Sequence, residues 1–347
     1  MTAAPEELLA RWDGFAGGTA TPFGNGLIND TFLVERDGRR CVLQRLHPVF
    51  SPLVHHDIEA VTAHLAAKGV TTPRLLRTND GALWVERATA ERNEVWRAQT
   101  FIEGGTSFDR VDGAARAFAA GALVGRFHGA LADLHHFYRA ARAGVHDTAK
   151  HLATLAEALD AHPAHRLRDE VGALADEIVA AGRALPDLTA LTKRHAHGDL
   201  KLSNLLFDAR GDGLCLVDLD TVGAMILPFE LGDALRSWCN PAGEDDARCA
   251  VDVDVFTAAL RGYGSTATMA PEDRDALVDG VFTICTELAA RFAADALNER
   301  YFGWNSQRYA GRGEHNLLRA RGQWSLAKSV RARRGELDGA VRAALGG

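Results

Sequence analysis

The segment HGDLKLSN, residues 197–204, gathers polar side chains that could do chemistry. Asp199 could accept a proton, Lys201 could neutralise negative charge, and Asn204 could offer an amide oxygen to a metal ion. A further carboxylate, Asp218, ends the apolar run GLCLVD fourteen residues after Asn204. Phosphoryl transfer needs neutralised phosphate charge and an oriented nucleophile more than covalent work by the protein. These residue types suit that reaction.

The spacing of these residues supports the same interpretation. Asp199 precedes Asn204 by five positions, the separation between the catalytic aspartate and the metal-binding asparagine in the catalytic loop of kinases. Mg²⁺ prefers hard oxygen ligands, which Asn204 and Asp218 offer. The alternative is a structural loop in which Asp199 caps a turn and Lys201 is solvated. The downstream Asp218 and the strand-rich region upstream favour the catalytic interpretation.

The first hundred residues predict strands around one helix. TPFGNGLINDTFLVE is a glycine-containing turn between two extended pieces, and RRCVLQRL is a short strand-type run. HHDIEAVTAHLAAKG has apolar residues at helical spacing and ends at Gly69, a candidate C-cap. GALWVER and EVWRAQTFIEGG predict two further antiparallel strands. Gly104 and Gly105 end the strand pattern.

The remainder of the chain is mainly helical in period. Residues 111–185 are alanine-rich with helical spacing, and the helical pattern returns from residue 228 to the end. Between them, ARGDG separates two apolar runs and predicts a hairpin. We therefore expect an α+β fold of two lobes, a β-rich lobe over residues 1–104 and a larger helical lobe over residues 105–347. A ligand cleft is expected where the lobes meet.

Composition excludes several classes of partner. The net charge of −7 argues against nucleic acid as the main partner, and an acidic surface would suit a cationic small molecule. Five scattered cysteines without CxxC spacing predict buried, reduced thiols in a cytoplasmic protein, not a disulfide framework or a zinc site. The N-terminus lacks a signal-peptide pattern, and no apolar run is long enough to span a membrane.

Longer stretches resemble a known family. HGDLKLSNLLFD followed by LCLVDLDTVG resembles the aminoglycoside phosphotransferase-like superfamily, small-molecule kinases with a protein-kinase-like fold. GLINDTFLVE, VLQRLHPVF, WRAQTFIEGGTSFD, LGDALR, YFGW and HNLLRARGQWSL further resemble the N-acetylhexosamine 1-kinases. Together these stretches cover about residues 24–330. The resemblance implies a Mg²⁺-dependent kinase that transfers the γ-phosphoryl group of ATP to a sugar hydroxyl, with GTP open as the donor.

The resemblance also implies roles for residues around the catalytic segment. Asp199 would be the catalytic base, and Lys201 would steady the γ-phosphate. Asn204 and Asp218 would hold Mg²⁺. Asp220, two residues further on, is a candidate for a second metal or for a role outside the metal's own ligands.

Other residues near this segment have supporting or acceptor-binding roles in this interpretation. His197 would anchor the loop, and Asp233 would support the backbone of the loop. Arg236 and Trp238 are candidate acceptor contacts, although an aromatic residue at helical spacing is more often part of a core. Candidate acceptor contacts on the C-terminal helices, for which buried structural ion pairs are the alternative, are Glu287, Arg291, Asn316 and Arg319.

The segment FGNGLINDTFLV stands where a glycine-rich phosphate loop is expected. Gly24 and Gly26 would let the backbone approach a phosphate, but Asn29 and Asp30 occupy the place of a third glycine. A plain β-turn is the alternative. The nucleotide-binding residues expected here are Gly24, Asn25, Gly26, Asn29 and Thr31.

The run CVLQR lacks the phosphate-pairing lysine of the third kinase strand. Gln44 or Arg45 would substitute, and strand alternation lets only one of them face the cleft. The need for a cation favours Arg45, with Glu59 as its partner on the following helix, although Glu59 could equally be a solvated helix residue. QTFIEGG would be the hinge that meets adenine through residues Thr100, Phe101, Ile102 and Glu103.

Three functions remain under consideration. A kinase acting on an N-acetylhexosamine or amino sugar at the anomeric hydroxyl is the leading interpretation. An aminoglycoside antibiotic phosphotransferase is the first alternative. A non-catalytic, nucleotide-binding pseudokinase module is the second, because the third-strand lysine and the third glycine are missing. Protein kinase activity is not favoured, since no APE segment follows Asp218.

Overall fold

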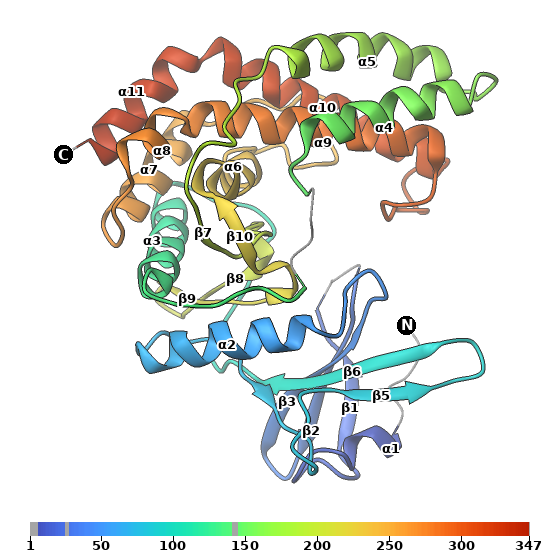
Figure 1. The fold of residues 1–347 in the computed structure, drawn as a ribbon, viewed down its shortest axis with the longest axis vertical. Helices are drawn as coiled ribbons and strands as arrows, with labels where there is room; N and C mark the ends of the chain where they lie inside the picture. Colours follow the sequence, from blue (N-terminus) through green and yellow to red (C-terminus); the bar gives the residue numbers. More distant parts are fainter. Residues whose placement is uncertain (1–5, 25–27, 141–144, 347) are drawn as a thin grey trace.

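The computed structural model describes residues 6–24, 28–140 and 145–346. It confirms the expected α+β fold, with a strand-rich part below a mainly helical part in Figure 1. The strand-rich lobe contains one antiparallel sheet in the order β1-β2-β3-β6-β4, and β5 also pairs with β6. Its elements are α1 (Glu6–Leu9), β1 (Thr19–Pro22), β2 (Asp30–Arg36), β3 (Arg39–Leu46), α2 (Val54–Ala67), β4 (Leu75–Leu76), β5 (Val85–Ala88) and β6 (Asn93–Thr100).

Strand alternation gives the sheet two different faces. One face forms a small core in which Phe32, Leu43 and Trp96 are buried. The other face carries Gln44 and Arg97, which are register partners in β3 and β6. Helix α2 contributes its apolar stripe to the larger core of the helical lobe, and this shared packing ties the two lobes together.

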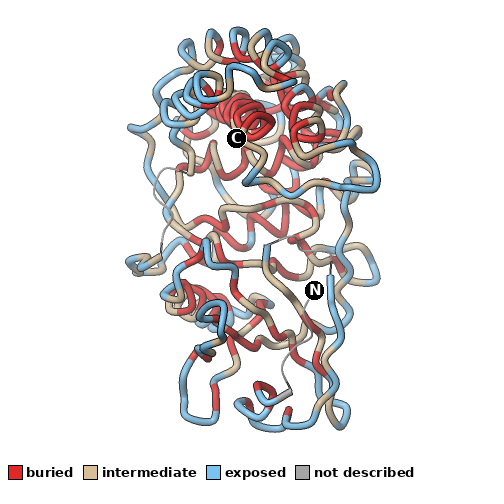
Figure 2. Tube along the Cα trace, turned by 90° about the vertical axis from the view of Figure 1, so that its right-hand side faces the viewer, coloured by how far each residue is buried: buried red, intermediate tan, exposed pale blue. Residues whose placement is uncertain are grey.

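The helical lobe is built around the long, buried helix α9, which contacts α10, α6, α4 and α5. Figure 2 shows buried positions concentrated in the interior of this lobe. Its helices are α3 (Ala114–Leu131), α4 (Thr148–Ala161), α5 (Arg168–Arg183), α6 (Leu227–Trp238), α7 (Val253–Gly264), α8 (Pro271–Asp275), α9 (Leu277–Asn298), α10 (Arg312–Ala332) and α11 (Arg334–Leu345). No helix in the described ranges is both long and apolar enough to cross a membrane.

Two short β-ribbons carry the segment from which the chemistry was predicted. The predicted hairpin is present as β8 (Leu205–Phe207) and β9 (Gly213–Leu216). A second ribbon, which the sequence did not predict, pairs β7 (Lys193–Ala196) with β10 (Gly223–Ile226). Two short 3₁₀ turns, η1 (Leu202–Asn204) and η2 (Leu219–Thr221), connect these strands. The ribbons bring residues 197–204 and 217–222 side by side.

Two sequence predictions need adjustment. The strand predicted over GALWVER begins only at Val85, because residues 78–82 form a turn in which the amide of Gly81 donates to the carbonyl of Thr78. The helical region predicted over residues 111–185 contains three separate helices, α3, α4 and α5. All five cysteines are buried and free, as the sequence predicted.

Candidate active site

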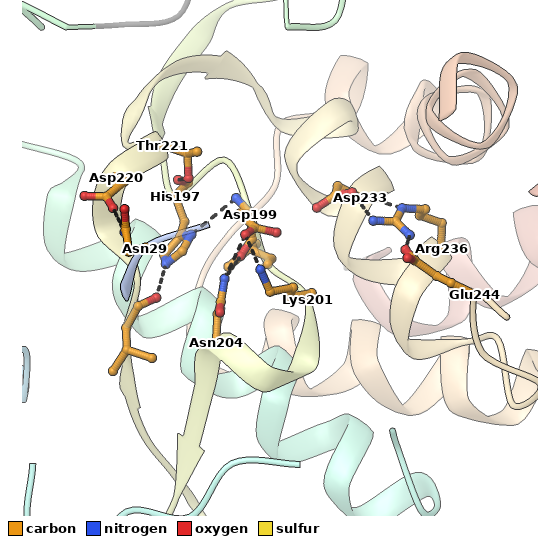
Figure 3. Close-up of polar contacts among 12 residues, drawn as sticks. Asn29, His197, Asp199, Lys201, Asn204, Asp220, Thr221, Asp233, Arg236 and Glu244 are labelled. Atoms are coloured by element: carbon orange, nitrogen blue, oxygen red, sulfur yellow. Dashed lines mark hydrogen bonds and ion pairs between the residues drawn. The ribbon is translucent and has the colours of Figure 1, made fainter. Parts of the chain in front are cut away.

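The catalytic segment leaves β7 through a tight backbone turn. Gly198 has φ +82°, and a Cβ at this position would lie 2.5 Å from the carbonyl oxygen of Thr221. A side chain here would therefore be both strained and in collision with backbone. The Thr221 hydroxyl donates to the carbonyl of His197 at 2.8 Å, and Val217 O lies 2.9 Å from His197 Nε2. These contacts hold the loop against residues 217–222, which contain the predicted metal ligand Asp218 and are called the metal segment (Figure 3).

Asp199, Lys201 and Asn204 converge in this loop (Figure 3). Lys201 Nζ lies 2.7 Å from Asp199 Oδ2, and Asn204 Nδ2 donates to the same oxygen at 3.0 Å and to the Asp199 carbonyl at 2.8 Å. Burial alone would lower the pKa of Lys201, but attraction to Asp199 and Asp218 outweighs it and the pKa is raised. Lys201 is thus a fixed cation, and its side chain remains 42% exposed. The Asp199 carboxylate is oriented and 27% exposed, as a base that meets an incoming hydroxyl requires.

Asp218 follows β9 in a strained conformation, with φ 64° and ψ 58° in the left-handed region. Burial, and then repulsion from Asp220, raises the pKa of Asp218 to about 6. No hydrogen bond or ion pair within the described ranges engages its carboxylate. A half-buried carboxylate that no hydrogen bond or ion pair among the described residues occupies fits a site for a hard divalent cation.

The composition of the candidate metal site also fits a metal that arrives with a nucleotide. Among the described residues, no three His, Cys, Asp or Glu side chains come together as a metal cluster. Mg²⁺ is usually bound through one or two protein carboxylates together with substrate phosphates, and it keeps several waters. Asp218 and the Asn204 side chain could supply such a partial set of ligands.

Glu230, which the sequence analysis did not single out, supports the catalytic loop. Its carboxylate, 1% exposed, accepts from the backbone amides of His197 at 2.7 Å and Gly198 at 3.0 Å. Asp233, the residue predicted for this role, instead accepts from Arg236 Nε at 3.0 Å and Nη2 at 2.8 Å. The prediction for Asp233 was wrong because Glu230 lies one helical turn earlier on α6, at the end that faces the loop. No local pattern in the sequence distinguishes the two carboxylates.

Replacing Glu230 by glutamine is expected to lower the free energy of unfolding by about 1–3 kcal/mol, because one loop amide would lose its buried acceptor. The turnover number should fall as well, since the loop backbone positions Asp199. Urea denaturation and steady-state kinetics measure the two effects. Glu244→Gln is the matched control, because Glu244 is 44% exposed and its one ion-pair partner among the described residues is Arg236, at the other end of α6. Wild-type stability in Glu230→Gln would contradict this account.

The third strand departs from the predicted pairing. Arg45 pairs with Asp30 and with Glu94, the latter at 2.6 Å, and its guanidinium lies 5.8 Å from the centre of the Trp96 ring. Glu59, the predicted partner, pairs with Arg77 at 3.0 Å and lies 4.0 Å from Arg74. The Arg45–Glu59 pair is therefore not formed. Arg45 occupies the face of β3 that packs over the small core of the N-terminal lobe.

Gln44 occupies the opposite face of β3, toward the helical lobe. Its amide donates to Thr31 Oγ1 at 3.1 Å and accepts from Arg97 at 2.8 and 2.9 Å. Arg97, missed by the sequence analysis, lies on β6 directly opposite Gln44 and forms a buried bidentate pair with Asp220. A charged residue within the hydrophobic strand run EVWRAQ was the available signal.

The carboxylate of Asp220, for which two roles were predicted, is fully engaged by other side chains. Arg97 bonds both of its oxygens, and Asn29 Nδ2 donates to Oδ2 at 2.6 Å. The side chain is 1% exposed. Burial alone would raise the pKa of Asp220, but Arg97 outweighs it and lowers the pKa. A second-metal role is therefore not supported, whereas a role outside the metal's own ligands fits.

The remaining residues predicted to bind the nucleotide lie at or just after the ends of strands β1 and β6. Gly24 has φ +74°, which suits a tight turn at the phosphate loop, while Asn25 and Gly26 lie outside the described residues. Phe101 contacts Phe23, with ring centres 5.9 Å apart. Three further residues were predicted to form the hinge. The Thr100 hydroxyl accepts from the Arg74 amide at 2.9 Å, and Glu103 pairs with Arg40 at 3.1 Å. Ile102 is half-buried.

The candidate acceptor contacts are engaged in structural interactions. Trp238 is buried and donates to the Leu200 carbonyl at 2.8 Å, so its ring packs beneath the catalytic loop instead of facing a sugar. Arg236 is buried between Asp233 and Glu244. Glu287 bonds His146 and Thr148, and the Arg291 guanidinium lies over the Phe302 ring. Asn316 donates to Asp295, and Arg319 donates to Asp245 and to the Gly303 carbonyl.

A cavity of about 520 Å³ lies beside α2. Its lining includes His56, Glu59, Arg77 and Trp84, and no residue of the catalytic loop. The site is therefore defined by its side-chain chemistry and not by the volume of this cavity.

The loop with Asp199, Lys201 and Asn204 and the segment with Asp218 lie at the junction of a strand-rich and a helical lobe, as in a protein-kinase-like fold. The profile of the phosphotransferase enzyme family matches residues 19–268. The chain belongs to this family and is therefore a phosphotransferase.

Solved structures with the same fold include three kinases of small molecules. A microcompartment-associated aminopropanol kinase has a TM-score of 0.61 and 17% identity, with 96% of this chain and 97% of that chain covered. An amicoumacin kinase in complex with AMP-PNP, Ca²⁺ and Ami has a TM-score of 0.65 and 15% identity, with 94% and 92% covered. An aminoglycoside phosphotransferase from Alicyclobacillus acidocaldarius has a TM-score of 0.63 and 15% identity, with 99% and 98% covered. At these identities the likeness shows the fold alone.

Proposed function

We propose that the protein transfers the γ-phosphoryl group of ATP, with Mg²⁺, to the anomeric hydroxyl of an N-acetylhexosamine or amino sugar. The observation that carries the chemical part of this proposal is the Asp199 carboxylate, held by Lys201 and Asn204 next to the unpartnered carboxylate of Asp218. Residues 1–104 would bind the nucleotide, and residues 105–347 would supply the catalytic and acceptor-binding groups.

In the proposed mechanism, Asp199 receives the proton of the attacking hydroxyl and orients its oxygen toward the γ-phosphorus. Lys201 stabilises negative charge on the transferring group, because its ammonium is already fixed at the base. Asn204 and Asp218 would hold Mg²⁺, which supplies charge neutralisation on the phosphates. As the new O–P bond forms, the bond between the γ-phosphorus and the β–γ bridging oxygen breaks and ADP leaves. The proton on Asp199 is then released to solvent, which regenerates the carboxylate.

The sugar acceptor is supported by the stretches that resemble N-acetylhexosamine 1-kinases over about residues 24–330. A cationic acceptor, such as an aminoglycoside, is the second candidate, and the net charge of −7 favours it. The names of structural relatives include an aminopropanol kinase and an aminoglycoside phosphotransferase, so acceptors with amines belong in any test.

An ADP-release assay with ATP and Mg²⁺ over a panel of acceptors tests this proposal. The panel contains N-acetylglucosamine, N-acetylgalactosamine, glucosamine, glucose, galactose, kanamycin, choline and homoserine. We expect turnover on an N-acetylhexosamine, with the product phosphate on the anomeric oxygen in the ³¹P spectrum. Turnover on kanamycin alone would replace the sugar by an antibiotic acceptor. Nucleotide binding without turnover on any acceptor would leave the non-catalytic, nucleotide-binding module as the alternative.

A further inference from the structure

A buried ion pair joins the two lobes beside the metal segment. Arg97 on β6 and Asp220 on η2 form a bidentate pair, and their side chains are 0% and 1% exposed. Asp220 lies two residues after Asp218 in the chain. The sheet of the N-terminal lobe is thereby bonded directly to the segment that would carry the metal.

The guanidinium of Arg97 is bonded on both sides. Its Nε and Nη2 donate to Gln44 Oε1 at 2.9 and 2.8 Å, and its Nη1 and Nη2 donate to Asp220. Gln44 stands in β3, where the phosphate-pairing lysine of kinases is expected. Because Arg97 has no exposed surface, it cannot take over the contact of that lysine with phosphate. Any effect of Arg97 on the reaction has to be exerted through the side chains it bonds, and of these Asp220 lies next to the predicted metal ligand Asp218.

Asn29 adds a third element to the same network. Its Nδ2 donates to Asp220 Oδ2 at 2.6 Å, and its Oδ1 accepts from the amide of His47 at 2.9 Å. Asn29 immediately precedes β2, at the end of the expected phosphate loop. Figure 3 shows Asn29 directed at Asp220 beside the catalytic loop. One carboxylate thus joins the phosphate loop, β6 and the metal segment.

We propose that Arg97, Asn29 and Asp220 are positioning residues that close the nucleotide lobe onto the metal segment and hold Asp218 in place, and that Asp220 is not a metal ligand. The proposal rests on the metal role proposed above for Asp218. In protein kinases a lysine–glutamate pair and the metal-binding aspartate have to be in place together. Here a single pair between the lobes would couple both requirements.

The backbone at Asp218 gives this coupling a physical reason. A non-glycine residue in the left-handed region persists only where its surroundings determine the conformation. The residues that follow supply such restraint, because Asp220 is clamped by Arg97 and the Thr221 hydroxyl donates to His197. Without the clamp, Asp218 could relax away from the site.

The test uses Arg97→Met, Arg97→Lys, Asp220→Asn and the double variant Arg97→Met/Asp220→Asn. We expect Asp220→Asn to lower kcat about 10–100-fold, as loss of an outer-shell partner does, while the Mg²⁺ concentration for half-maximal rate stays within about 3-fold. The double variant should be no slower than the slower single variant, because both substitutions break one interaction. Arg97→Lys keeps the positive charge but loses the planar guanidinium that bonds both oxygens of Asp220. It should therefore recover only part of the rate lost in Arg97→Met.

A second readout does not depend on turnover. Urea unfolding of the metal-free, nucleotide-free protein should show the same non-additivity between Arg97→Met and Asp220→Asn. This cycle still tests the clamp if no acceptor in the panel is phosphorylated, so failure of the proposed function and failure of the clamp are distinguishable. If the variants of the buried residues Arg97 and Asp220 do not fold, Asn29→Ala replaces them in the test, because it removes a side chain that is only half-buried. The KM for ATP should then rise about 3–10-fold.

The matched control is Glu94→Gln. Glu94 also lies on β6, but its side chain is on the face of the sheet opposite Arg97, where it forms a buried ion pair with Arg45 that the substitution weakens. It should leave the Mg²⁺ dependence and the KM for ATP unchanged. Additive single variants, or an Asn29→Ala protein with wild-type kinetics, would overturn the clamp. A tenfold or larger rise in the Mg²⁺ requirement of Asp220→Asn, with Arg97→Met unaffected, would make Asp220 a metal ligand and reject the proposal.

Discussion

Replacing Asp199 by alanine is expected to lower kcat by about 10²–10⁴-fold, the contribution of a positioned general base. The carboxylate is the acceptor for both Lys201 and Asn204, and its side chain is 27% exposed. Nucleotide binding should persist, because the phosphate loop, the hinge and Asp218 remain. Rapid-quench kinetics for the chemical step and titration with a non-hydrolysable ATP analogue measure the two properties separately.

Asp199→Asn is the sharper companion variant, since it keeps the size of the side chain and removes its ability to take a proton. Asp212→Ala is the control, because this exposed carboxylate in the β8–β9 turn has no role in the proposed mechanism. We expect Asp199→Asn to be as inactive as Asp199→Ala and Asp212→Ala to be fully active. An Asp199→Asn protein with more than a few per cent of wild-type kcat would remove Asp199 from the role of base.

Replacing Asp218 by asparagine is expected to abolish the effect of Mg²⁺ on nucleotide binding. A charged ligand on the metal is worth several kcal/mol of charge stabilisation, so affinity for the Mg²⁺–ATP complex should fall about 100-fold or more. Asparagine tolerates the left-handed backbone at this position better than alanine does, so the local fold should be kept. Isothermal titration with ATP, with and without Mg²⁺, gives the two affinities.

The metal-free protein supplies the control for Asp218→Asn. Without Mg²⁺ the variant should bind ATP at least as well as the wild type, because a half-buried negative charge that would repel the phosphates has been removed. A Mg²⁺-dependent gain in affinity equal to that of the wild type would show that Asp218 does not hold the metal. Asp212→Asn should behave as the wild type in both conditions.

These two variants also separate the proposed kinase from a pseudokinase module. A non-catalytic module would show no catalytic loss in Asp199→Ala, because it has no turnover to lose. A kinase with an untested acceptor would still bind nucleotide and would still lose its Mg²⁺ response in Asp218→Asn. The Mg²⁺ response tests the metal site in either case, and turnover on an acceptor separates the kinase from the module.

The sequence by itself determined the local parts of this protein. The catalytic loop, with Asp199, Lys201 and Asn204 in contact, follows from spacing within eight residues, and the β8–β9 hairpin follows from ARGDG between apolar runs. The helix over HHDIEAVTAHLAAKG was also predicted within a few residues of α2. Such features are encoded by neighbouring residues, so short-range pattern and turn chemistry are sufficient.

Only the tertiary structure decided which residues meet across long separations in the chain. Alternation in β3 predicted that Gln44 and Arg45 face opposite ways, but the packing of the sheet decided that Gln44 faces the helical lobe and Arg45 the small core. The partnerships of Arg97 with Asp220 and of Glu230 with the catalytic loop join segments 123 and 33 residues apart. A charged residue will pair with any opposite charge or backbone group that the fold brings near, and residue type alone does not specify which one.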